Sequence, residues 1–138
     1  MKFENAAKAI LVFGCFLALC SPGGCNIVVN EFELSPPDDT TIWVELYNTA
    51  DEAVNIDGWM IKIADEAWEG PIYLEGSIEP RGFLAVDGQE SWMTTGNGTI
   101  YLYDASGAEV DKTPLHGDNE HNDFTYGRHP DGKDTDTK

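Results

Sequence analysis

The sequence is poor in basic residues and in cysteine. It contains 8 Lys and Arg against 25 Asp and Glu, a formal net charge of −17. Such a charge repels phosphate backbones and anionic lipid surfaces, so we do not expect a nucleic acid partner. Its three cysteines, Cys15, Cys20 and Cys25, all lie within the first 25 residues. A disulfide framework is therefore excluded for the rest of the chain.

The longest apolar run is also too short to span a membrane. Residues 10–20 (ILVFGCFLALC) would extend about 16 Å as a helix, against a bilayer core of about 30 Å. Lys2 and Lys8 precede the run and SPGG at 21–24 ends it. This pattern predicts a signal peptide over residues 1–24, with cleavage between positions 20 and 25. We therefore expect a protein that is extracellular or held at the cell surface or envelope.

A lipid anchor is an alternative to free secretion. The attachment point would be Cys20 or Cys25, although the residues before each depart from the usual lipidation motif. The sequence leaves open whether the mature chain is soluble or anchored.

No convincing amphipathic helix follows residue 25. Instead, short β-rich segments alternate with turns containing Gly, Pro, Asp or Asn, and seven to nine strands are expected. The segments are 27–34, 41–48, 53–56, 59–64, 71–74, 82–87, 99–104, 108–111 and 124–128. This pattern predicts an all-β fold of the β-sandwich type, with a mixed α+β fold as the weaker alternative. Trp59 is expected in the core, Trp43 on the opposite face of its strand, and Trp68 and Trp92 in loops.

Catalytic motifs are missing. The chain has no Gly-x-Ser-x-Gly elbow, no phosphate-binding loop, and no cysteine nucleophile beyond residue 25. Glu31 and Glu45 fall on neighbouring predicted strands, and paired carboxylates can perform acid–base chemistry. We expect these two residues to be structural or to lie on a solvated sheet face, and we expect a protein that is not an enzyme.

Two further sites are candidates. The polar loop 116–123 carries oxygen ligands at Asp118, Glu120, Asn122 and Asp123, a possible weak calcium site that departs from the usual calcium-loop template. No other cofactor is expected. Asn97-Gly98-Thr99 satisfies the glycosylation sequon at Asn97, and Asn-Gly before a strand also predicts a tight turn.

A series of motifs, in order, resembles the lamin tail domain, in its stand-alone secreted microbial form. The motifs are VNEF at 29–32, WVELYN at 43–48, DEAVNIDGW at 51–59, IEPRGFLAV at 78–86, TIYLYDASGAEVD at 99–111 and GRHPDG at 127–132. The resemblance implies an immunoglobulin-like β-sandwich over residues 26–132, followed by a polar tail at 133–138. The segment that commonly follows GRHPDG in this family is missing, so we expect the last edge strand to be short or absent.

The resemblance and the predicted export favour a non-catalytic binding module that contacts a protein or an envelope polymer. One alternative is an accessory protein working with a separate secreted nuclease or hydrolase, since lamin tail domains are often fused to such enzymes. Another is a structural component of the envelope. A sheet edge left open by the short C-terminus would also suit addition of a strand from a partner.

Overall fold

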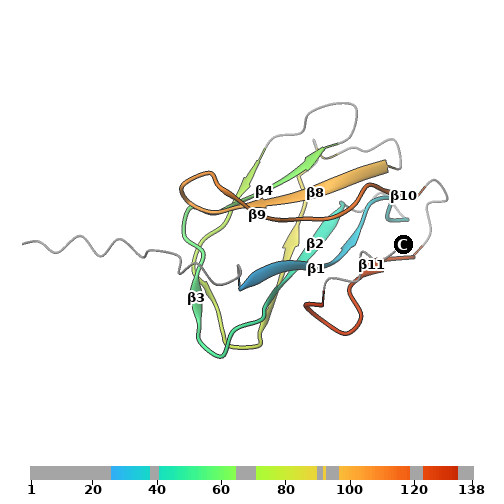
Figure 1. The fold of residues 1–138 in the computed structure, drawn as a ribbon. Coiled ribbons are helices and arrows are strands. Elements are labelled where there is room, and N and C mark those ends of the chain that lie inside the picture. The colour runs from blue at the N-terminus through green and yellow to red at the C-terminus, as the bar shows by residue number, and fades with distance from the viewer. Residues whose placement is uncertain are drawn as a thin grey trace, which may run out of the picture.

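The all-β prediction is confirmed. The structure, a computed structural model (Figure 1), describes residues 26–37, 41–64, 71–89, 92, 97–118 and 123–133. Eleven β-strands occur in these residues. Within these same ranges, no helix is long and apolar enough to cross a membrane.

The first sheet has four antiparallel strands in the order β11–β1–β2–β7. Their bounds are β11 Tyr126–Gly127, β1 Ile27–Glu33, β2 Trp43–Asn48 and β7 Phe83–Asp87. The register between β1 and β2 shifts between Val29 and Glu31, which makes Asn30 a bulge. The last strand, β11, is two residues long, in agreement with the expectation of a short edge strand.

The second sheet has the order β10–β8–β4–β5, with β9 also paired to β8. Its strands are β10 His116–Gly117, β8 Asn97–Tyr103, β4 Met60–Ala64, β5 Ile72–Tyr73 and β9 Glu109–Lys112. A separate ribbon pairs β3 Val54–Asn55 with β6 Ser77–Ile78. In Figure 1, β8 and β9 (orange) lie against β1, so the two sheets form a sandwich.

The core lies between the sheets because each long strand alternates buried and less buried residues. In β2, Val44 and Leu46 point inward, and in β4, Ile61 and Ile63 do so. Alternation of this kind is what a strand with one buried face requires. The buried apolar residues are Ile27, Val29, Phe32, Leu34, Ile42, Val44, Leu46, Ile56, Ile61, Ile63, Leu74, Ile78, Trp92, Ile100 and Leu102.

The tryptophans divide as their positions in the sequence predict. Trp59 is partly buried and packs against the core, and Trp43 lies on the outer face, where its indole N–H donates to Glu33 Oε2 at 2.8 Å. Trp92 follows β7 outside any strand and is buried in the core cluster. Trp68 lies outside the described residues.

The prediction of a tight turn at Asn97-Gly98 is wrong. These two residues begin β8 and pair with Gly117 and His116 of β10. Gly98 packs closely against the core there, because a Cβ would lie 3.3 Å from a methyl carbon of Leu34 and 3.4 Å from one of Ile63. The strand β10 also lies inside the stretch 116–123 that the sequence predicts to be a loop.

Buried Asn48 joins three segments of the chain at one end of the sandwich. Its side-chain N–H group donates to the carbonyls of Glu52, Ile78 and Glu79 at 2.8, 3.0 and 3.0 Å, and its side-chain oxygen accepts from the Ala50 N–H. The side chain is fully buried. Buried carbonyls need donors, so this amide fixes the loops that follow β2 and β6.

We expect Asn48→Ala to lower the free energy of unfolding by about 3 kcal/mol, since it leaves buried carbonyls without their donor. Urea denaturation measures the change. The matched control is Asn55→Ala, which removes an exposed hydrogen bond to Asp57 and should cost under about 1 kcal/mol. Equal losses in the two variants would contradict the role given to Asn48.

The turn between β8 and β9 is organised by the Asp104 carboxylate. One oxygen, Oδ1, accepts from the Ser106 hydroxyl at 2.6 Å and from the backbone N–H groups of Ser106 and Ala108. The hydrogen bond from the Ser106 hydroxyl is the largest cause that lowers the pKa of Asp104, and the backbone donors add to it. Donors that favour the charged form stabilise this turn only while Asp104 is ionised.

The lowered pKa fixes the sign of a pH effect. Asp104 contributes stability above its unfolded-state pKa of about 3.9, and this contribution is lost as the pH falls through the lower folded-state pKa. We expect Asp104→Asn to be less stable than the unmodified chain at neutral pH, with a difference that shrinks in acid. Urea denaturation at several pH values measures it, and Ser106→Ala should reproduce part of the effect. A difference that did not change with pH would contradict this assignment.

Candidate functional site

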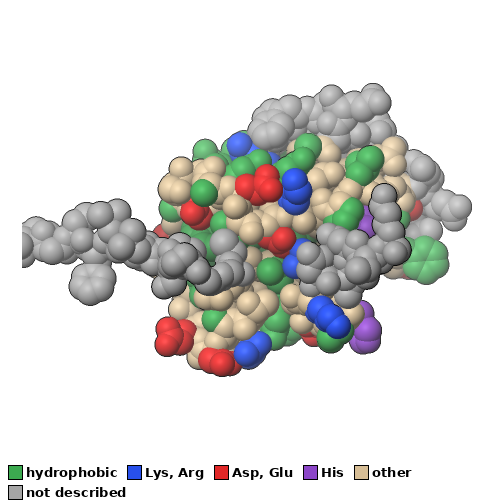
Figure 2. All heavy atoms as spheres, viewed as in Figure 1, with side chains coloured by type: hydrophobic (Ala, Val, Ile, Leu, Met, Phe, Trp, Pro, Cys, Tyr) green, Lys and Arg blue, Asp and Glu red, His purple; other side chains and the backbone are tan. Residues whose placement is uncertain are grey.

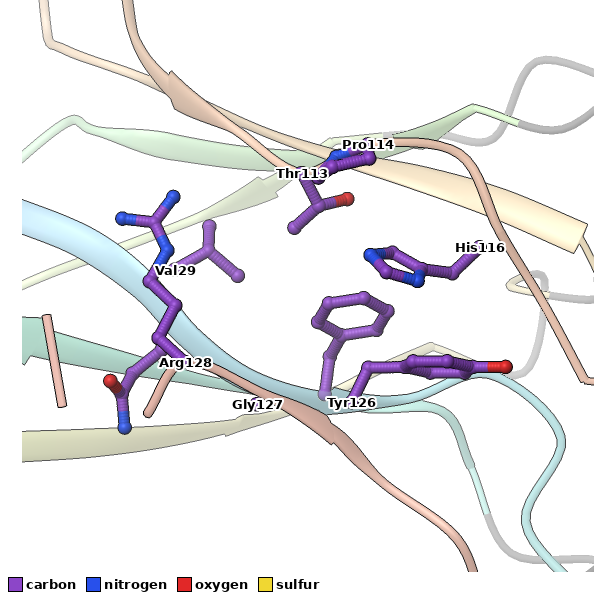
Figure 3. Close-up of a pocket in the computed structure, with 9 residues that line it drawn as sticks. Val29, Thr113, Pro114, His116, Tyr126, Gly127 and Arg128 are labelled. Carbon is purple, nitrogen blue, oxygen red and sulfur yellow. The ribbon is translucent and has the colours of Figure 1, made fainter. Parts of the chain in front are cut away.

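A shallow cleft of about 160 Å³ lies where β1 and β11 of the first sheet face the segment from β9 to β10. Val29, Phe32 and Thr113 are buried beneath it. Pro114 and His116 form one side, and Tyr126, Gly127 and Arg128 form the other (Figure 3). We call this feature the aromatic cleft.

Three rings pack together at one end of the aromatic cleft. The ring centroids of His116 and Tyr126 are 4.4 Å apart, and Phe32 lies 5.3 Å from His116 and 5.6 Å from Tyr126. The Tyr126 hydroxyl donates to the carbonyl oxygen of Gly117. Figure 3 shows the His116 and Tyr126 rings converging from opposite sides, with Arg128 at the other end of the cleft.

At the other end of the aromatic cleft, the lining residue Arg128 is held by the carboxylate of Asp111. Its Oδ1 accepts from Arg128 Nη2 at 3.0 Å, and its Oδ2 accepts from the backbone N–H of Val29 at 2.8 Å. The two side chains are 13% and 15% exposed, so water screens this ion pair only weakly. A single carboxylate therefore joins β9 of one sheet to β1 of the other and to the residue after β11.

The segment after β11 is held by the bulge residue Asn30. The Asn30 carbonyl accepts from the Arg128 N–H at 2.8 Å, and its side-chain oxygen accepts from the Gly132 N–H at 2.9 Å. Gly132 has a φ of +71°, and a Cβ there would lie 2.8 Å from atoms of Thr49 and Tyr47. The sequence GRHPDG thus closes the edge of β1, and its last glycine fits where a side chain would collide.

Exposed apolar side chains lie next to the aromatic cleft in the sequence. Leu115 stands between the lining residues Pro114 and His116 and is 70% exposed, and Phe124, two residues before Tyr126, is 72% exposed. Figure 2 shows hydrophobic side chains and histidine at the end of the molecule where Figure 1 places β10 and β11. Exposed groups of this kind, beside a hollow, are characteristic of contact surfaces.

The structure brings the predicted acid pair together. Glu31 and Glu45 are directly opposite each other on β1 and β2. Glu31 Oε1 accepts from the Thr125 hydroxyl at 2.5 Å, and Glu45 Oε1 accepts from Asn30 Nδ2 at 3.0 Å. Each carboxylate therefore has a structural partner on the outer face of the sheet, which supports the solvated-face interpretation.

The calcium hypothesis concerns residues that the structure describes only in part. Asp118 is buried and Asp123 is exposed, while Glu120 and Asn122 lie outside the described residues. In the described ranges, no group of three His, Cys, Asp or Glu side chains is placed to hold a metal ion. The calcium site stays a prediction, as does glycosylation at Asn97, whose side chain is exposed at the start of β8.

The comparison with known families decides what kind of domain this is. A model of the Lamin Tail Domain family matches residues 21–115, more than two thirds of the chain. The chain belongs to the lamin tail domain family. The immunoglobulin-like sandwich that the resemblance implies agrees with the two sheets described above. No curated protein matches the sequence at a significant level.

The matched region of the lamin tail domain ends before β10, so the aromatic cleft combines matched and unmatched segments. Val29, Phe32 and Thr113 belong to the matched part, whereas His116, Tyr126 and Arg128 follow it. Sequence reasoning missed this cleft, because its sides are more than 80 residues from its floor strand. The available signal was Phe32, an inward-facing aromatic residue near the end of the first predicted strand.

We expect Asp111→Ala to destabilise this lamin tail domain by about 3 kcal/mol, because it leaves a mostly buried guanidinium and the Val29 N–H without an acceptor. Thermal and urea unfolding measure the loss. The matched control is Glu109→Ala on the same strand, which breaks the exposed pair with Lys112 and should cost under about 1 kcal/mol. Similar losses in both variants would contradict the role of Asp111.

Proposed function

We propose that this lamin tail domain is an exported, non-catalytic module that binds a protein or an envelope polymer through the aromatic cleft. The observation that carries the proposal is the grouping of Phe32, His116 and Tyr126, with the exposed residues Leu115 and Phe124 close to the lining residues in the sequence. Aromatic rings with an apolar body and a polar edge suit both kinds of partner.

The leader sequence supports the location. Two lysines, eleven apolar residues and a small-residue break form the pattern of a signal peptide over residues 1–24. The mature protein would be extracellular or held at the envelope, and a lipid at Cys20 or Cys25 would tether it there.

The chemistry of the described side chains supports a binding role over catalysis. His116 packs against two rings, and Asp111 is engaged with Arg128 and the backbone of Val29. A general base needs a free path to its substrate, and these groups are held by structural contacts. The net charge of −17 argues against nucleic acid as the partner.

The test uses two exposed residues beside the aromatic cleft. Leu115→Ser and Phe124→Ser together should lower the affinity of the purified chain for isolated cell envelopes about tenfold, because they remove the apolar contact area. Tyr73→Ser is the matched control, since Tyr73 is 67% exposed on β5 of the other sheet. Sedimentation of the chain with the envelopes measures binding. Undiminished binding by the double variant would overturn this use of the cleft.

A further inference from the structure

The first sheet ends at β7, on the far side of β2 from β1 (Figure 1, yellow). Its five residues pair with β2 without interruption, from Trp43 opposite Asp87 to Tyr47 opposite Phe83. A strand of this length extends about 17 Å. Among the described residues, no strand pairs with its outer side.

The backbone hydrogen bonds show which groups of β7 point outward. Asn48 N–H donates to the Gly82 carbonyl, and Gly88 N–H donates to the Ile42 carbonyl. Bonded and non-bonded residues alternate along an antiparallel pair, so Leu84 and Val86 bond to β2. The N–H and carbonyl groups of Phe83, Ala85 and Asp87 therefore face away from the sheet.

The described residues cover one edge of this sheet and leave the other without a paired strand. On the β1 edge, β11 pairs with Glu31 and Phe32, and Asp111 accepts from the Val29 N–H beside the bulge. The β7 edge has neither a bulge nor a Lys or Pro between Gly82 and Gly88. Natural edge strands usually carry such features to prevent pairing with other chains.

The charged residues around β7 favour a basic partner. On the outer face, Asp87, Ala85 and Phe83 lie opposite Trp43, Glu45 and Tyr47, and the rings of Phe83 and Tyr47 stack at 4.6 Å. The three strands β1, β2 and β7 contain no Lys or Arg. Arg81, just before β7, is paired with Asp51 at 2.9 Å.

We propose that β7 is a docking edge that accepts an extended, basic peptide segment of another protein as a fifth strand of this sheet. The outward groups of Phe83, Ala85 and Asp87 supply main-chain hydrogen bonds. Lysine or arginine side chains of the segment lie over Asp87 and toward Glu45, past the small side chain of Ala85. The apolar side chains that alternate with the basic ones point to the inner face, next to Leu84 and Val86. The proposal goes beyond the aromatic cleft, which lies at the opposite edge of the sheet.

A second copy of this chain is a poorer occupant. Antiparallel pairing of two β7 strands about Ala85 places each Asp87 opposite a Phe83, so no charge is compensated. Each copy also carries a net charge of −17, which opposes association.

The probe is a synthetic peptide of about eight residues that alternates Lys and Val, compared with one that alternates Glu and Val. Nuclear magnetic resonance of the purified chain follows the backbone amides during titration. We expect the Lys peptide to bind about tenfold more tightly than the Glu peptide, and to slow exchange of the Phe83, Ala85 and Asp87 amides. Equal binding of the two peptides, or protection of other amides only, would overturn the proposal.

Ala85→Pro is the decisive variant. Its N–H points outward, so proline removes a docking donor without breaking a bond to β2, and edge strands tolerate proline there. The affinity of the Ala85→Pro variant for the Lys peptide should fall about tenfold. The control is Tyr73→Lys, on the edge of the other sheet, in which the Lys peptide should still protect the outward amides of β7. Ala85→Lys, which keeps the N–H but adds a repelling charge, serves if the proline variant does not fold.

The outcomes separate this proposal from that for the aromatic cleft. Lys-peptide affinity that Ala85→Pro leaves unchanged would overturn the docking edge, whereas the envelope assay with Leu115→Ser and Phe124→Ser tests the cleft independently. A dimer in sedimentation whose β7 amides are protected without peptide would identify a second copy as the occupant and overturn the assignment to a basic segment.

Discussion

The Asp111 carboxylate connects the two sheets at the place where the pairing of β1 with β2 becomes irregular. A bulge at Asn30 shifts the register of β1 against β2, and beyond β11 the Val29 N–H has no neighbouring strand to accept it. Asp111 supplies that acceptor from the opposite sheet and at the same time fixes Arg128. The end of the chain, the aromatic cleft and the closed edge of the first sheet all depend on this contact.

The strands were predictable because their information is local. In residues 41–48 the pattern placed Trp43 on the face away from the core, and the structure buries Val44 and Leu46 on the other face accordingly. The order of the family motifs added that the sandwich is immunoglobulin-like. The turn preference of the Asn97-Gly98 dipeptide was misleading, because pairing with β10, a strand distant in the sequence, places both residues in β8.

The aromatic cleft was not predictable in the same way. Val29 and Asp111 are separated by 82 positions, and Gly132 and Asn30 by 102. Nothing in the local pattern says that the loop after β9 contains a two-residue strand or that His116 meets Tyr126. These contacts follow from how the sheets pack, which a period of two along a single strand does not specify.

The two edges of the first sheet have different roles: the β1 edge stabilises the domain, and the β7 edge is the one proposed to bind a partner. At β1 the backbone is satisfied from within, by Asp111, β11 and the turn that ends at Gly132. At β7 three residues keep their donors and acceptors turned outward, beside an acidic and aromatic face. An edge that must not pair needs either cover or a repelling charge. Because Asp87 is the only charged residue of β7, its repulsion acts on acidic segments and leaves basic ones free to pair.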